Sequence, residues 1–72
     1  MSVESDRLAA FEEARLIASQ ARKYGEAVRP DFFAGFVAKT YPDTGYDRGH
    51  IAEMIKRAAI LAGVKVAAEE PR

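Results

Sequence analysis

Apolar residues recur at steps of three and four in three stretches of the chain, and this spacing predicts three amphipathic helices. The first stripe contains Ala10, Ala14, Ile17, Ala21, Tyr24 and Val28, and it is widened on one side by Leu8, Phe11 and Ala18. We therefore expect an all-α fold, a compact three-helix bundle with helices at about 5–24, 30–41 and 45–62 and a short C-terminal tail.

Prolines, glycines and capping residues set the predicted boundaries of these helices. Ser2 or Ser5 can cap the first helix, and Gly25 can end it, because glycine adopts the left-handed conformation at little cost. Pro30 suits the first position of the second helix, and Pro42 requires that helix to stop near Tyr41.

Two starting points are open for the third helix. Thr44 can cap it with Asp47 as the partner of a capping box, or Asp47 can be the cap itself. Gly63 predicts its end.

Phenylalanines dominate the second predicted helix. Phe33, Phe36, Val37 and Tyr41 share one face, which we expect to be packed in the core because aromatic side chains bury large areas. Phe32, beside Phe36, is the better candidate for an exposed position.

The end of the third predicted helix is apolar all round. Its stripe is formed by Ile51, Met54, Ile55, Ala58 and Ala62, whereas Ile60 lies on the opposite side. An all-apolar turn is expected to be buried. We therefore expect Ile60 to be covered, either by residues 64–72 folding back through Val64 and Val66 before a flexible tail, or by a second copy of the chain.

The composition fits a single folded domain over residues 1–72. The chain has 49% hydrophobic residues, and its 11 basic residues balance its 11 acidic ones. Because there is no cysteine and no long apolar run, we expect a cytoplasmic protein without a signal peptide or membrane association.

Residues that could carry out catalysis are scarce, so we expect no enzyme activity. The single histidine, His50, is spaced by three from Asp47 and from Glu53, and such residues diverge around a helix rather than converge on a metal ion. The scattered glycines match no phosphate-binding loop. No metal, cofactor or small-molecule ligand is indicated.

The order of the second helix, the break and the third helix is similar in topology to a helix-turn-helix, which suggests DNA binding. The start of the third helix would then read DNA, with candidate contacts Tyr46, Arg48, Gly49, His50, Lys56 and Arg57. The break is longer than the usual tight turn, and the nine residues after Gly63 are too few for a wing hairpin. Since counterion release drives DNA binding and the chain is neutral, such a protein would be expected to act as a dimer.

The function ranked first is therefore that of a small noncatalytic adaptor, regulator or inhibitor that contacts another protein or itself. Its candidate interface residues are Leu16, Phe32, Tyr46 and Ile60. DNA binding is the alternative.

Overall fold

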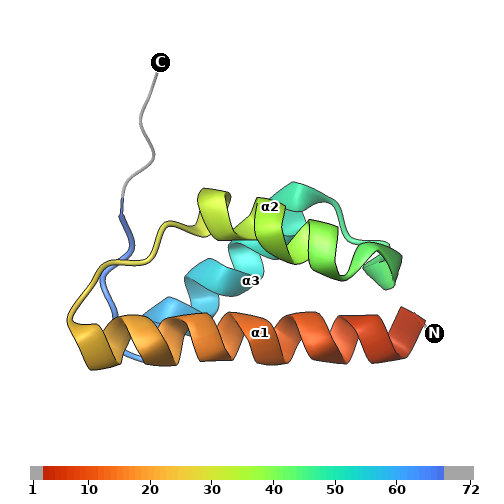
Figure 1. The fold of residues 1–72 in the computed structure, drawn as a ribbon. Coiled ribbons are helices and arrows are strands. Elements are labelled where there is room, and N and C mark those ends of the chain that lie inside the picture. Colours follow the sequence, from red (N-terminus) through yellow and green to blue (C-terminus); the bar gives the residue numbers. More distant parts are fainter. Residues whose placement is uncertain (1–2, 68–72) are drawn as a thin grey trace, which may run out of the picture.

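The computed structural model describes residues 3–67 and confirms an all-α, three-helix fold (Figure 1). Its elements are α1 (Val3–Tyr24), α2 (Pro30–Thr40), the short 3-10 helix η1 (Pro42–Thr44) and α3 (Arg48–Leu61). None of the helices within residues 3–67 is long and apolar enough to cross a membrane.

The helix ends follow from local chemistry. Gly25 directly follows α1 and has a φ of 68°. Gly63 lies two residues after the end of α3 and has a φ of 78°, which glycine adopts at little cost. Pro30 opens α2, and at the start of α3 the Asp47 side chain accepts a hydrogen bond from the His50 backbone N–H at 2.7 Å. Asp47 is therefore the cap of α3.

Two of the alternative caps are not used. Thr44 does not begin α3, because it is buried in η1 and its hydroxyl accepts a hydrogen bond from the Tyr46 N–H at 3.0 Å. Ser5 is not a cap either, because it lies inside α1. Ser2 and most of the predicted tail lie outside the described residues.

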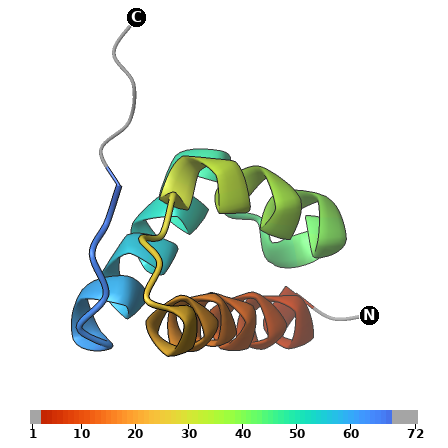
Figure 2. The ribbon, with the colours of Figure 1, turned by 60° about the vertical axis from the view of Figure 1, so that its left-hand side comes forward.

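Helix α3 packs against both α1 and α2, so it forms the centre of the fold (Figures 1 and 2). The N-terminal part of α1 is tied to η1 by two side chains. The buried Asp6 carboxylate accepts a hydrogen bond from the Asp43 N–H at 3.1 Å, and Arg7 Nε donates one to the Thr44 carbonyl at 2.7 Å. These contacts hold η1, which precedes α3 in the chain, against α1.

The core is built from alanines, valines and two isoleucines, and no aromatic side chain within residues 3–67 is fully buried in it. Its buried members are Ala10, Ala14, Ala18, Ala21, Val28, Ala34, Val37, Ile51, Ile55, Ala59 and Val64. Alanines at the helix contacts bring helix axes close together and leave no room for a phenylalanine between them. Of the face predicted on the second helix, Val37 is buried and Phe33 and Tyr41 are partly buried against the core, whereas Phe36 is exposed. Tyr24 of the first predicted stripe is also exposed.

The prediction that Ile60 is covered at the end of α3 is wrong for the monomer. Ile60 is 58% exposed and Leu61 is 88% exposed, so this apolar turn is not buried within the monomer. The following segment does turn back, and Val66 forms an isolated parallel bridge with Val28, while the Val28 N–H donates to the Lys65 carbonyl at 2.9 Å. The segment thus pairs with the link between α1 and α2 and leaves Ile60 open.

Candidate functional site: an apolar groove between α1 and α3

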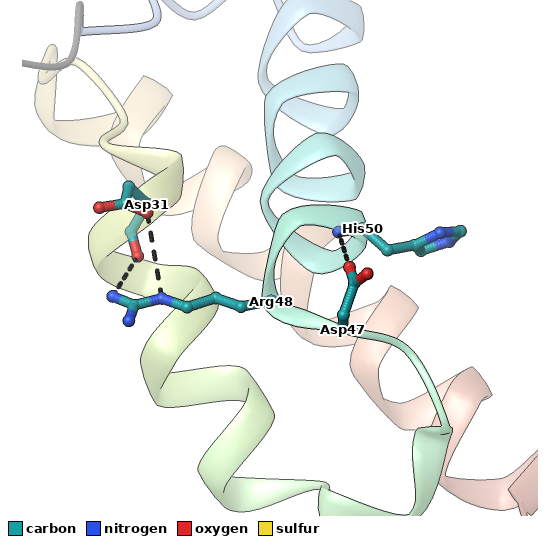
Figure 3. A network of polar contacts seen from close by, with 4 residues as sticks. All are labelled: Asp31, Asp47, Arg48 and His50. Atoms are coloured by element: carbon teal, nitrogen blue, oxygen red, sulfur yellow. Dashed lines mark hydrogen bonds and ion pairs between the residues drawn. The ribbon is translucent and has the colours of Figure 1, made fainter.

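The start of α3 holds three of the six predicted DNA contacts, Arg48, Gly49 and His50, and Figure 3 shows Arg48 and His50 extending in different directions. Arg48 reaches across to α2, where its Nε lies 3.9 Å from an Asp31 carboxylate oxygen and its terminal nitrogen donates to the Asp31 carbonyl at 3.3 Å. Its guanidinium lies over Gly35, 3.2 Å from where a Cβ would stand. In Figure 3, His50 extends away from Arg48.

Tyr46 and His50 form a separate layer beside α1. Their rings stack with centroids 4.1 Å apart, and the Arg7 guanidinium carbon lies 4.6 Å from the Tyr46 ring centroid. Tyr46 is consequently half-buried between α1 and α3, which leaves it little surface for a partner.

The remaining predicted DNA contacts also lie on α3. Gly49, Lys56 and Arg57 are exposed, and Arg57 forms an ion pair with Glu53 at 3.9 Å. Lys56 and Arg57, as neighbours in a helix, point about 100° apart. Since Asp31, Asp47 and Glu53 lie among these groups, the start of α3 is not a uniformly positive surface.

Three of the four predicted protein-interface residues are exposed, but they lie on different helices. Leu16 is on α1, Phe32 on α2 and Ile60 on α3, each about opposite its own helix's buried residues. The structure does not gather them into one patch, and none of them lines the groove described next.

Helices α1 and α3 border an open, mostly apolar groove with a volume of about 640 Å³. It is lined by Phe11, Arg15, Ala18, Ser19 and Arg22 of α1, by Met54, Arg57, Ala58 and Leu61 of α3, and by Ala62. Phe11 is 50% exposed and Leu61 is 88% exposed, so large apolar surfaces border this groove without being covered.

All the charged residues that line the groove are arginines. Arg57 has the exposed ion pair with Glu53, whereas within residues 3–67 neither Arg15 nor Arg22 forms an ion pair. Exposed arginines beside uncovered apolar side chains combine the two features that recur at protein interfaces.

A second periodic row of residues on each of the two helices lines this groove, beside the core stripe. Phe11, Arg15, Ala18 and Arg22 recur along one side of α1, and Met54, Arg57 and Leu61 do so on α3. Only the packing of α1 beside α3 shows that these two rows face the same space.

A metal site is not found in the described part of the chain. Within residues 3–67, no three histidine, aspartate or glutamate side chains are close enough to hold a metal ion. No protein-family model matches the chain, and comparisons with curated proteins and with solved structures found no match.

Proposed function

We propose that this chain is a noncatalytic adaptor, regulator or inhibitor that binds a protein partner in the α1–α3 groove. The observation that carries the proposal is the uncovered apolar surface of Leu61 and Phe11 beside a floor of alanines. Burying one such large side chain contributes about 2 kcal/mol, so a few anchors at this site can support a specific complex.

The exposure of Leu61 supports a protein partner. A leucine that is 88% exposed contributes almost nothing to the monomer's own stability, yet it lines the same groove as Met54 and Ala58. Single exposed leucines are common on soluble proteins. Here, however, Leu61 borders the same groove as the half-exposed Phe11, and clustered apolar exposure of this kind is typical of interaction sites.

DNA binding through the start of α3 is the second candidate function. In its favour, the Arg48 side chain is 61% exposed and its ion pair with Asp31 is long, at 3.9 Å, so DNA phosphates could compete for it. Against it, Asp31 already neutralises the residue best suited to contact guanine. A dimer would be needed to raise the positive charge, as the neutral composition indicates.

Photo-crosslinking in the cells that make the protein tests the first proposal. The photoreactive residue p-benzoylphenylalanine replaces Phe11 in the groove, and in a control chain it replaces Leu16 on the outer side of α1. We expect one dominant protein adduct from position 11, its loss when Leu61→Glu is added to the same chain, and no such adduct from position 16.

Two results would count against the groove. Equal adducts from positions 11 and 16 would indicate nonspecific contact, and crosslinks to nucleic acid from a probe at His50 with none to protein from position 11 would favour the DNA alternative. Because Leu61 is almost fully exposed, Leu61→Glu is expected to leave the helical circular dichroism spectrum unchanged.

A further inference from the structure

Charge in the groove is strongly one-sided, although the whole chain is balanced. Acidic and basic residues number 11 each, yet the ionisable residues lining the groove are Arg15, Arg22 and Arg57. The charge of Arg57 is partly offset by its exposed ion pair with Glu53 at 3.9 Å, so Arg15 and Arg22 carry most of the excess positive charge. Complementary charge improves both the rate and the specificity of association. A partner with carboxylates flanking its apolar contacts would therefore fit this surface better than a neutral or basic one.

The backbone of the groove walls restricts the form of that partner. Both walls are α-helices, whose N–H and C=O groups are already bonded within the helix, so an extended peptide would find no sheet edge to pair with. A helical segment satisfies its own backbone and needs only side-chain contacts, which the groove offers.

The size and floor of the groove suit a short helix. Its lining on α1 extends from Phe11 to Arg22, a rise of about 16 Å, which matches roughly three helical turns. Ala18, Ala58 and Ala62 lie along it, and small side chains allow a second helix to approach closely. Phe11, Met54 and Leu61 can then contact apolar residues spaced by three and four on the incoming helix.

A second copy of this chain seated groove to groove is a poorer fit. A two-fold symmetric dimer presents the same surface on both subunits, so the three arginines of each groove would share one interface in which the groove lining supplies no carboxylate. Opposed like charges disfavour such an interface.

We infer that the occupant of the groove is an acidic amphipathic α-helix of a partner protein. Apolar residues on one face of that helix contact Phe11, Met54 and Leu61, and its flanking carboxylates pair with Arg15, Arg22 and Arg57. This inference depends on the proposed function, because it specifies the partner of the same groove.

A charge-exchange experiment with synthetic helices tests it. The probes are two stapled three-turn peptides with leucines on one face, one flanked by glutamates and the other, otherwise identical, flanked by lysines. Stapling is needed because an isolated helix of this length is marginally stable in water. Binding to the full chain is measured by isothermal titration calorimetry at about 50 mM and about 200 mM salt.

The protein variants are matched in net charge. One carries Arg15→Glu, Arg22→Glu and Arg57→Glu in the groove, and the control carries Lys39→Glu, Lys56→Glu and Lys65→Glu at exposed positions that do not line it. We expect the unchanged protein and the lysine control to bind the acidic helix at least about tenfold more tightly than the basic one. The groove variant should instead bind the basic helix more tightly. Raising the salt should weaken the preference of the unchanged protein and the reversed preference of the groove variant.

Three results would overturn the inference. They are no binding of the acidic helix at either salt concentration, equal binding of the two helices, and loss of the preference in the lysine control as much as in the groove variant. If the peptides fail but a probe at position 11 still captures a partner protein, only the helix inference is wrong. If both fail, the proposed function is wrong as well, and concentration-dependent sedimentation or retention by duplex DNA would identify self-association or DNA binding instead.

Discussion

Two isoleucines of α3, five residues apart, allow a sharp test of which side of that helix is covered. Ile55 is fully buried, whereas Ile60 is 58% exposed. Each is changed to alanine, which removes the same three carbon atoms from the same helix, so the two variants differ chiefly in the surroundings of the side chain.

The magnitudes follow from burial. At about 0.8 kcal/mol for each buried carbon, Ile55→Ala loses about 2.4 kcal/mol of transfer free energy. The cavity left in a tightly packed core raises the total to about 3–4 kcal/mol. Less than half of Ile60 is buried, and alanine forms helix better than isoleucine, so Ile60→Ala should cost less than about 1 kcal/mol.

The assay is urea unfolding followed by far-ultraviolet circular dichroism. A domain of this size has a total unfolding free energy of only about 4–11 kcal/mol, so Ile55→Val, at about 1 kcal/mol, serves as the milder variant if Ile55→Ala does not fold. That smaller loss corresponds to a decrease of roughly 4–8 °C in Tm.

The reasoning would be refuted if Ile60→Ala destabilised the chain as much as Ile55→Ala. A cost at Ile60 that grew with protein concentration would mean that a second copy covers this residue, as the all-apolar turn of the sequence had suggested. A cost at Ile60 independent of concentration would mean that the monomer covers it in a way that its 58% exposure contradicts.

Three further predictions concern the ends and joints of the helices, each measured as the free energy of unfolding in urea. Asp47→Ala should lower the unfolding free energy by about 1 kcal/mol, because the His50 N–H loses its side-chain acceptor, whereas Asp47→Ser should retain most of this stabilisation. Equal losses in the two variants would disprove the cap. Asp6→Ala should cost about 1–3 kcal/mol and speed hydrogen exchange at the Asp43 N–H, because its side-chain acceptor is lost; unchanged exchange would contradict the contact. Gly63→Ala should cost about 1–2 kcal/mol from its φ of 78° alone, since nothing lies within 4 Å of the added Cβ, whereas Gly49→Ala inside α3 should stabilise by about 0.5–1 kcal/mol; the same sign for both would refute the backbone argument.

Much of the fold could be predicted from local signals. Pro30, Pro42 and the glycines that follow α1 and α3 act through their own backbone geometry, so the boundaries that they set needed no knowledge of packing. The alanines of α1, spaced by three and four, correctly predicted the buried side of that helix, because this spacing places them on one face. Helix number and order followed from these residues.

The placement of the large apolar residues could not be predicted in this way. Aromatic size suggested that Phe36 is buried, but alanine-lined helix contacts are too close to admit it. The all-apolar turn suggested that Ile60 is covered, but this residue lies on the side of α3 opposite its buried residues. Which exposed residues come together depends on how two helices lie in space. The sequence therefore indicated Leu16, Phe32 and Ile60, which stay apart, and missed that Phe11 of α1 and Leu61 of α3 line the same groove.

The charge environment at the start of α3 could not be predicted from the sequence either. In the sequence, Arg48 stands at the first turn of a third helix and suits DNA contact. Its pairing with Asp31, 17 residues earlier, arises only because α2 and α3 pack side by side and Gly35 leaves space for the guanidinium. A tertiary contact thus changes what a locally favourable residue is able to bind.

The most direct test of the groove as the contact site is a pair of titrations followed by amide spectra of isotopically labelled protein. One titration uses the stapled acidic helix, and the other uses random-sequence duplex DNA, both at about 50 mM salt. We predict that the helix shifts the amide signals of Ala18, Ser19, Ala58 and Ala62 and that the DNA leaves the spectrum unchanged. Shifts confined to Arg48, Gly49 and His50 on adding DNA, with none in the groove on adding the helix, would contradict the account.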